Sequence, residues 1–556
     1  MRKRVTVVGE GPDEIGNRYL LLTVDGKGFP PIPVADISDS GSFIAKLKQN
    51  GANIFTSKSR NEVLRDIESY KAEKPSFRVV TRVGWVGLRY ALPDKIFGTG
   101  KTPIHTIFDN LGRAIVEKYR VKGSLTAWQS KIAALCTGNS RLMFAASLGL
   151  TGPILRYAEE PKLGGFQLVG PGETGKTTAA MVAGSLWGCH KDSGRREIGF
   201  AEHWHTTGGE SGGKIEITAL AHNDTVLILD ETKLTSAKTV LDAAFALAEG
   251  AEKERLNASE PARSWRFYFL TTSNHTLDEL GEAARMTVDD ARRGRLVEIP
   301  LPEQGDGIYE DLHGLHDGRA LTDRLKARCR TYFGAPSREY LRRLVTEARA
   351  DKDRLKKFLR AERKTYLAAI EKSSKQQGLK PLNRASGRFA TVFAAGSLAI
   401  RYGIFPWSRQ ILLRAILACQ MDGLTMPIGK PKPEQAPAVS ARRKLIEWLQ
   451  EHRHEFMNLD KKAPRLGKHE FGSVPGYSAT FKNKKWFYLT ADQFREITGG
   501  GESAEQLKKD LADDKLLVKA SNDRYVVQRP VFSGAAGNKG FRSVHALKVV
   551  ILKEQC

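Results

Sequence analysis

The sequence predicts a multidomain α/β protein built around a parallel β-sheet, and three observations support this fold class. The chain has 556 residues, enough for roughly three or four domains. Apolar runs typical of buried strands, such as GGFQLVG, TVLILDE and RFYFLTTSN, alternate with helical runs. A Gly-rich loop joins the first of these strands to the helix KTTAAMVAGSLWG. Strands that alternate with helices form a parallel sheet covered on both faces.

Changes in pattern divide the chain into five segments. Residues 1–115 mix β-branched runs, turns and one amphipathic helix, which indicates a small N-terminal α+β domain. Residues 116–325 hold the alternating strands and helices of the core. Residues 326–427 become helical and charged, which predicts a helical lid. Residues 428–439 are Pro-rich and predict a linker. Residues 440–556 run helix, aromatic strand, helix, helix and two strands, an order that predicts a winged-helix domain.

The charge balance favours a polyanionic partner. The chain carries 88 Lys and Arg against 63 Asp and Glu, a formal net charge of +25. This surplus fits nucleic acid or an acidic membrane surface, although a solubilising surface gives the same balance. The 5 cysteines include no Cys-x-x-Cys pair, so we expect a reducing, cytoplasmic location. No signal peptide or membrane-spanning run is evident, so no membrane partner is expected.

The segment GPGETGKT satisfies the phosphate-loop pattern G-x-x-x-x-G-K-[ST] between a strand and a helix. Its backbone amides and the helix N-terminus are suited to phosphate. We expect Lys176 to contact the β- and γ-phosphates of ATP and Thr177 to place its hydroxyl on Mg²⁺. A look-alike, FGTGKTPIH, fails because Pro103 follows where a helix should begin. The predicted nucleotide-binding residues are Gly170, Pro171, Gly172, Glu173, Thr174, Gly175, Lys176, Thr177 and Thr178.

Two further strands are predicted to end in catalytic residues. Asp230 and Glu231 follow the apolar run VLIL, at the strand end that lies beside the phosphate loop. We expect Asp230 to complete the Mg²⁺ shell and Glu231 to polarise the attacking water. Asn274, at the end of the next strand, is expected to orient that water, although an Asn there could simply turn the chain.

Three arginines, Arg292, Arg293 and Arg295, precede the last short strand of the core. An arginine that reaches the γ-phosphate of a neighbouring subunit stabilises the charge that develops in phosphoryl transfer. With such an arginine, hydrolysis of ATP depends on the assembly of subunits. The same cluster would also suit a solvated or nucleic-acid-facing patch.

With these motifs the chain resembles the domain-of-unknown-function family 927 proteins and, through them, the MCM-like AAA+ helicases of phages, plasmids and mobile cassettes. The stretches that carry the resemblance are RVGWVGLRYALPDKIFG, GSLTAWQSKIAALCTGNSRLMFAAS, the phosphate loop, AHNDTVLILDE and NRASGRFATVFAAGSLA. Trp187-Gly188 and the His-Asn-Asp step before the acidic strand are its most specific details. The resemblance implies an AAA+ P-loop ATPase core and makes Arg295 the first choice for the trans arginine. It also makes Lys253 and Arg255 candidate DNA-binding residues, although both could belong to a solvated turn.

Two hypotheses of function follow, and both require ATP and Mg²⁺. The first is an ATP-dependent DNA helicase that forms a homo-oligomeric, hexameric ring and unwinds single-stranded or forked DNA for a phage or mobile element, with a primase or initiator as a further partner. The second is a DNA-binding AAA+ ATPase that acts as initiator, loader or defence sensor without processive unwinding. The charge, the lid and the C-terminal domain disfavour a metabolic kinase.

Overall fold

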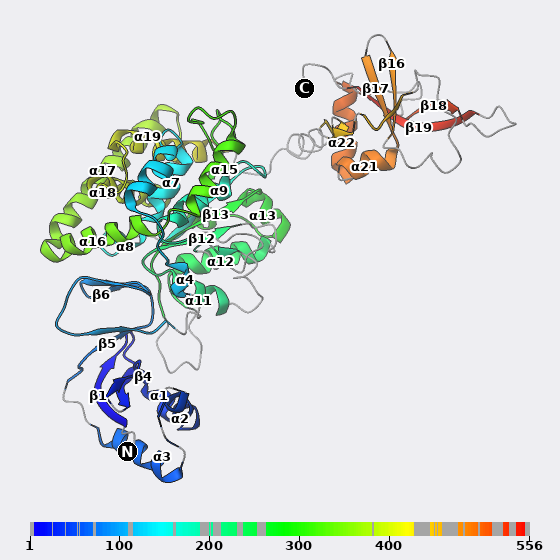
Figure 1. The fold of residues 1–556 in the computed structure, drawn as a ribbon. Helices are drawn as coiled ribbons and strands as arrows, with labels where there is room; N and C mark the ends of the chain where they lie inside the picture. Colours follow the sequence, from blue (N-terminus) through cyan, green and yellow to red (C-terminus); the bar gives the residue numbers. More distant parts are fainter. Residues whose placement is uncertain are drawn as a thin grey trace. The chain divides into compact units, whose positions relative to one another are not determined.

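The computed structural model contains two compact units, residues 1–426 and 427–556, each treated separately (Figure 1). The expected linker 428–439, Glu231, Lys253 and Arg255 lie outside the described residues. The structure describes residues 5–24, 26–38, 40–49, 51–52, 54, 56–70, 74–108, 115–158, 163–189, 200, 202–203, 213–230, 237–252, 263–380, 383–426, 445–446, 448–449, 451–452, 454–458, 476–481, 484–498, 501–513, 517, 526–532 and 541–550.

The centre of the first unit is a 5-stranded sheet in the order β11-β12-β13-β10-β14. Every neighbouring pair in it is parallel, which confirms the predicted α/β fold. Strands β10, β12 and β13 are buried at every residue, as expected for strands with helices on both faces. The strands are β10 (Gly164–Val169), β11 (Glu202–His203), β12 (Val226–Asp230), β13 (Tyr268–Ser273) and β14 (Leu296–Pro300).

Helices cover both faces of this sheet (Figure 1). The chain passes from β10 to the edge strand β11 and then returns across the sheet through β12 and β13 to β14. Because crossovers between parallel strands are right-handed, the helix after β10 lies on one face and the helices of the return path lie on the other. The first face carries α7 (Ser140–Gly149) and α9 (Lys176–Ser185), which pack together. The second carries α12 (Ala237–Glu249) and α13 (Leu277–Ala284), with α11 (Gly213–Ala221) before β12 and α14 (Asp290–Arg293) before β14.

A helical segment follows the sheet and packs back onto α7. The expected boundary between residues 325 and 326 falls inside its first helix, which begins after the N-cap Asp317. Buried Arg388 anchors the segment, because its guanidinium donates to the Leu163 carbonyl at 3.2 Å. No described helix is long and apolar enough to cross a membrane. The helices are α15 (Gly318–Cys329), α16 (Ala335–Ala350), α17 (Lys352–Gln376), α18 (Asn383–Arg401) and α19 (Arg409–Thr425).

The N-terminal part of this unit is α+β, as predicted. Strands β1 (Val5–Pro12), β2 (Arg18–Val24), β3 (Lys27–Gly28) and β4 (Ile32–Pro33) form an antiparallel sheet beside α1 (Val34–Ser38), α2 (Ser40–Gln49) and α3 (Ser57–Ser69). Short strands β5 (Arg78–Val80), β6 (Gly84–Val86), β7 (Arg89–Ala91), β8 (Ile96–Phe97) and β9 (Ile104–Thr106) lead to α4 (Ile115–Lys118), which spans the expected boundary between residues 115 and 116. The look-alike Lys101-Thr102 lies in the loop between β8 and β9, and no helix follows it.

Besides α4 and α7, the described residues between β9 and β10 contain four short helical segments. These are α5 (Leu125–Trp128), the π-helix η2 (Gln129–Ala133), α6 (Ala134–Cys136) and α8 (Gly152–Leu155), the last of which follows α7. The buried Trp128 indole donates to Ser185 Oγ at 2.9 Å. This bond fixes the connection against the end of α9.

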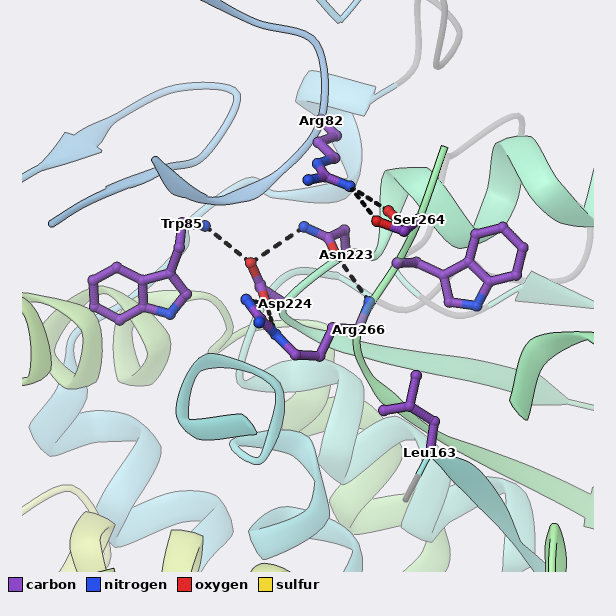
Figure 2. Close-up of a pocket in the computed structure, with 8 residues that line it drawn as sticks. Arg82, Trp85, Leu163, Asn223, Asp224, Ser264 and Arg266 are labelled. Carbon is purple, nitrogen blue, oxygen red and sulfur yellow. Dashed lines mark hydrogen bonds and ion pairs between the residues drawn. The ribbon is translucent and has the colours of Figure 1, made fainter. Parts of the chain in front are cut away.

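The Asn-Asp step before β12 joins the N-terminal strands to the core (Figure 2). Asn223 Nδ2 donates to the Val83 carbonyl at 2.7 Å, and the Trp85 amide donates to Asp224 Oδ2 at 3.0 Å. Arg266 binds the other oxygen of Asp224, with Nε at 2.8 Å. Asn223 and Asp224 are buried, so their polar atoms need these partners. The residues that mark the family resemblance are therefore a structural joint.

The described part of the second unit contains a 5-stranded sheet in the order β15-β16-β17-β19-β18 and the helices α21 and α22. Phe487 and Tyr488 are buried, so the aromatic run of β17 contributes to the core of this unit rather than forming an exposed stacking surface. Its elements are β15 (Met457–Asn458), β16 (Tyr477–Phe481), β17 (Lys484–Leu489), α21 (Ala491–Thr498), α22 (Gly501–Asp513), β18 (Val526–Phe532) and β19 (Phe541–Val550).

The Trp-Gly pair after α9 leads to a first prediction. Trp187 is buried and its indole donates to the Gly149 carbonyl at 2.7 Å, while a methyl group on Gly188 would lie 1.8 Å from the Lys118 carbonyl oxygen. Because two backbones meet there, Gly188→Ala should lower the free energy of unfolding by about 1–3 kcal/mol. Chemical denaturation measures this. Gly28→Ala, where no atom lies within 4 Å of the added methyl, should be close to neutral; equal effects would contradict the packing argument.

Candidate nucleotide site

The phosphate loop connects β10 to α9 at the C-terminal edge of the parallel sheet. Gly175 has φ 91°, in the left-handed region, and α9 begins at the next residue. A methyl group on Gly175 would lie 2.8 Å from Tyr309 Oη, so both the conformation and the packing require glycine. This geometry aims the first backbone amides of α9 into the loop, as the motif predicts.

Lys176 is buried at the start of α9 and its ammonium lies inside the loop. Nζ donates to the Gly170 carbonyl at 2.8 Å and also to that of Pro171. A buried cation is costly, and the positive end of a helix dipole is unfavourable for it. An anion within the loop would satisfy the ammonium and the helix amides together. The position of Lys176 therefore favours a phosphate.

Asp230, the last residue of β12, lies against the start of α9. Thr177 Oγ1 donates to Asp230 Oδ1 at 3.2 Å, and Thr272 Oγ1 donates to the same oxygen at 2.5 Å. Asp230 is 3% exposed. Thr272 comes from β13, which lies between β10 and β12. Sequence reasoning missed Thr272, although a polar pair within the apolar run FYFLTTS was a usable signal.

Asn274 lies beside the phosphate loop. It follows β13 directly, and the Gly170 amide donates to the Ser273 carbonyl at 3.2 Å. A methyl group on Gly172 would lie 3.7 Å from Asn274 Nδ2. The structure thus brings Lys176, Thr177 and Asp230 to one edge with Asn274.

These residues fit a nucleoside triphosphate with Mg²⁺. The loop offers backbone amides and an ammonium for phosphate oxygens. Thr177 and Asp230 offer the hydroxyl and carboxylate oxygens that Mg²⁺ prefers. The donor set therefore matches the cofactors expected from the sequence.

A segment after β14 supports the loop, and the sequence analysis missed it. The Ile308 amide donates to the Thr174 carbonyl at 2.9 Å, and the Tyr309 hydroxyl bonds Thr322 of α15. Buried Arg141 of α7 adds a second link, because it donates to the Pro300 carbonyl at 2.8 Å and pairs with Asp422 of α19 at 2.5 Å. Both links join the nucleotide edge to the helical segment.

The three arginines before β14 have different surroundings. Arg293 pairs with Asp278 and lies 3.8 Å from Glu298, so it is held inside the subunit. Arg295 bonds Glu249 at 2.7 Å and its guanidinium lies 3.8 Å from the Phe245 ring centre. No described residue accepts a hydrogen bond from the buried Nη1 of Arg292.

Arg295 and the phosphate loop of the same chain lie at opposite ends of the sheet. The Gly165 amide donates to the Arg295 carbonyl at 2.7 Å, whereas the loop follows Val169 at the far end of β10. Gly165, beside Arg295, and Val169, before the loop, are four residue steps apart along β10, a distance of about 13 Å. An arginine at this position faces away from its own nucleotide site.

A cavity of about 290 Å³ lies at that same N-terminal end, before β10, β12 and β13 (Figure 2). Arg82 extends across it to Ser264, where it donates to the carbonyl and to Oγ. Ser264 also pairs with Ala251 in an antiparallel bridge. The bridge closes a segment, here called the hairpin, that includes Lys253 and Arg255, both outside the described residues. Thus the cavity is part of the joint around Asp224, away from the nucleotide edge.

Residues 33–266 match the family described as "Domain of unknown function (DUF927)". This confirms the resemblance to family 927 over those residues. No curated protein matches the chain. The chain is similar to the structure described as "SCCmec type IV Cch - active helicase", with 15% identity and a TM-score of 0.57 over 99% of this chain and 94% of that one. At this identity the similarity concerns the fold alone.

A second structure, "The A form apo structure of NrS-1 C terminal region-CTR(305-718)", shares 12% identity over 74% of this chain and 88% of that one. Its TM-score is 0.25, too low to support any conclusion about fold.

A largely buried carboxylate that accepts a hydrogen bond from the first turn of α13 leads to a second prediction. The pKa of Glu298 is raised to about 7, mainly by burial; the Leu277 amide and Arg293 oppose this rise, and Asp278 and Glu279 contribute to it. A carboxyl with a raised pKa keeps its proton longer in the folded chain, so its contribution to stability falls as pH rises from about 4.5 to about 7. In the wild-type chain this carboxyl should lower the free energy of unfolding by about 3 kcal/mol between pH 5 and pH 8. Glu298→Gln should remove this decrease, which chemical denaturation at the two pH values measures.

The exposed Glu303 provides the control for that comparison. Glu303→Gln should leave the difference between pH 5 and pH 8 at the wild-type value. If Glu298→Gln also leaves it unchanged, the buried carboxylate does not control the pH dependence.

Proposed function

We propose that the chain is an ATP-dependent DNA helicase that hydrolyses ATP at the loop Gly170–Thr178 and acts as a homo-oligomeric AAA+ ring. The observation that carries the proposal is the meeting of Thr177 and Asp230 at 3.2 Å, with Lys176 and Asn274 at the same edge. A Gly-rich turn with no ligand would not need both a buried ammonium and a buried carboxylate at one helix start.

The residues of the site have distinct tasks. Loop amides and Lys176 bind and orient the phosphate oxygens, and Lys176 exchanges its bonds to loop carbonyls for bonds to phosphate. Thr177 and Asp230 would hold Mg²⁺, and the ion would supply positive charge opposite the charge that develops on the transferring phosphoryl group. Asn274 orients the attacking water, and Glu231, adjacent to Asp230 in the chain, accepts its proton.

In a ring, a neighbouring subunit supplies a further positive charge to the triphosphate. Arg295 lies at the end of the sheet opposite its own loop, so we assign it to the triphosphate of a neighbouring subunit. Glu249, its partner within the chain, is 53% exposed, and exposed ion pairs are weak enough to exchange partners. Arg292 is the second candidate for this trans role, whereas Arg293 is held by Asp278 and Glu298.

Three features support DNA as the partner. The chain carries a net charge of +25. Lys253 and Arg255, to which we assign contacts with DNA, belong to the hairpin that the pairing of Ala251 with Ser264 closes. In the second unit, β17, α21, α22 and the hairpin β18–β19 follow one another, with β17 paired to β19. This order supports the winged-helix assignment, a domain type that places a helix in a DNA groove.

Lys176→Ala tests the site, with Lys101→Ala of the look-alike motif as matched control. Wild type and Lys101→Ala should hydrolyse ATP and displace a strand from forked DNA. Lys176→Ala should lose at least about 100-fold in turnover, because the charge that orients the phosphates and stabilises the negative charge of the transition state is removed. Phosphate release and a fluorescent fork measure both activities.

The same assay separates the alternatives. Normal turnover by Lys176→Ala would exclude the nucleotide site proposed here. If DNA stimulates wild-type turnover without strand displacement, the chain is instead a DNA-binding ATPase that acts as initiator, loader or sensor.

The trans arginine is tested by mixing variants. Arg295→Ala should bind ATP but lose turnover, since its own site is intact while its neighbour lacks an arginine. Mixing it with Lys176→Ala should restore part of the turnover, because some interfaces then pair an intact loop with an intact arginine. Arg293→Ala should lower stability instead. If only Arg292→Ala shows loss and restoration, the role belongs to Arg292.

A further inference from the structure

One exposed face of α17 carries a dense row of positive charge that the proposed nucleotide and hairpin sites do not use. The helix has 9 Lys and Arg against 3 Asp and Glu over 25 residues. One of the acids, Glu362, is buried and paired with Arg409 of α19 at 2.7 Å. The exposed basic residues that form the row, here called the α17 strip, are Lys356, Lys357, Arg360, Lys364 and Lys375.

Helix geometry places the strip on one face of α17, with Lys356 to Lys364 together and Lys375 beyond Leu367 and Glu371. At 3.6 residues per turn its five members fall within a sector of about 100°, over a length of about 29 Å. The opposite side holds Leu355, Leu359, Tyr366 and Ile370, which are buried, and α17 packs on α18 and α19. Figure 1 shows α17 running beside α18 at the edge of the first unit. The strip therefore faces away from the protein.

The neighbouring helix α16 shows that this charge is not a general feature of the surface. Its exposed Arg342 and Arg343 both bond Glu339, at 2.6 and 2.7 Å, and these bonds lower the pKa of Glu339 to about 2. Among the described residues, no carboxylate forms an ion pair with Lys356 or Lys364. Glu371 is the one acid on the same face.

We propose that the α17 strip binds the phosphate backbone of DNA, as a contact separate from the hairpin and the winged-helix domain. This rests on the proposed function, which makes DNA the polyanion. Duplex DNA carries one charge per about 1.7 Å, so a strip of this length faces a similar length of dense negative charge. The strip holds the part of a forked DNA that is outside the hairpin contact.

Other partners fit the strip less well. A membrane-surface helix inserts an apolar face, whereas the apolar face of α17 is buried and only Leu367, at 38%, is a large exposed hydrophobic residue there. Protein interfaces are depleted in lysine and enriched in aromatic residues at their centre. Four of the five strip residues are lysines.

The test compares two pairs of substitutions in the full chain that remove the same charge. Lys356→Gln with Lys364→Gln removes two strip charges, and Arg342→Gln with Arg343→Gln removes two from α16. Binding to a fluorescein-labelled DNA fork is measured by anisotropy between 50 and 200 mM salt. Each lost phosphate contact should reduce the slope of log K against log salt by about 0.9 for duplex DNA, so the strip variant should lose about 1.8.

The α16 variant should keep the wild-type slope, and both variants should keep the ATP turnover measured without DNA. Equal weakening in the two variants would show an effect of net charge alone and overturn the proposal, as would no weakening in the strip variant. If the strip variant no longer binds phosphatidylserine vesicles but still binds the fork like the wild type, the strip is a membrane contact. That result would also overturn the proposal.

A failure of the proposed function gives a different pattern. In that case the wild-type chain itself would not bind the fork. Protection of Lys364 from acetylation by the fork in the wild-type chain, read by mass spectrometry, gives a measure that needs no variant; absence of protection where the fork binds would count against the strip.

Discussion

The contact between the Thr177 hydroxyl and the Asp230 carboxylate, at 3.2 Å, is the constraint on which the proposed nucleotide site depends. Asp230 ends β12, whereas Thr177 lies in α9, the helix that follows β10. These two strands are not neighbours, because β13 lies between them. The start of α9 must therefore extend over the end of β13. Thr272 occupies this position and binds the same carboxylate oxygen. A larger or apolar residue there would separate the helix from the acid or leave Asp230 buried with fewer donors, which is costly.

Sequence reasoning predicted the elements whose signals are local. The strands β10, β12 and β13 and the start of α9 follow from apolar runs and from a glycine before Lys176. It did not predict the contacts that join distant segments, such as Arg141 with Asp422 or Ile308 with Thr174. No pattern in the sequence specifies such pairs, because each partner is an ordinary polar or apolar residue within its own segment. The order of the strands in the sheet was not predicted either, because it depends on pairing between segments that are distant in the sequence.

The joint around Asp224 shows a second limit of prediction from sequence. The sequence marked its Asn-Asp step as a specific detail, yet gave it no role, because the partners Val83 and Trp85 lie about 140 residues earlier. In the structure these bonds fasten the N-terminal strands to the starts of β12 and β13. Ser264, at the base of the hairpin, belongs to the same region, and Arg82 donates to its carbonyl. The N-terminal part is thereby attached to the base of the segment to which contacts with DNA are proposed.

The two ends of the sheet are connected through α13. Its first turn follows Asn274 by two residues, and the Leu277 amide donates to Glu298 of β14 at 2.8 Å. Arg293, at the end of α14, binds Asp278 in that same turn. The residue beside the phosphate loop and the arginine segment thus share one packed cluster of charges. Packed interiors shift as units rather than deform, so in the proposed ring a displacement of Asn274 would be passed to the base of the arginine segment. This cluster is then a short path by which one proposed nucleotide site could act on the next subunit.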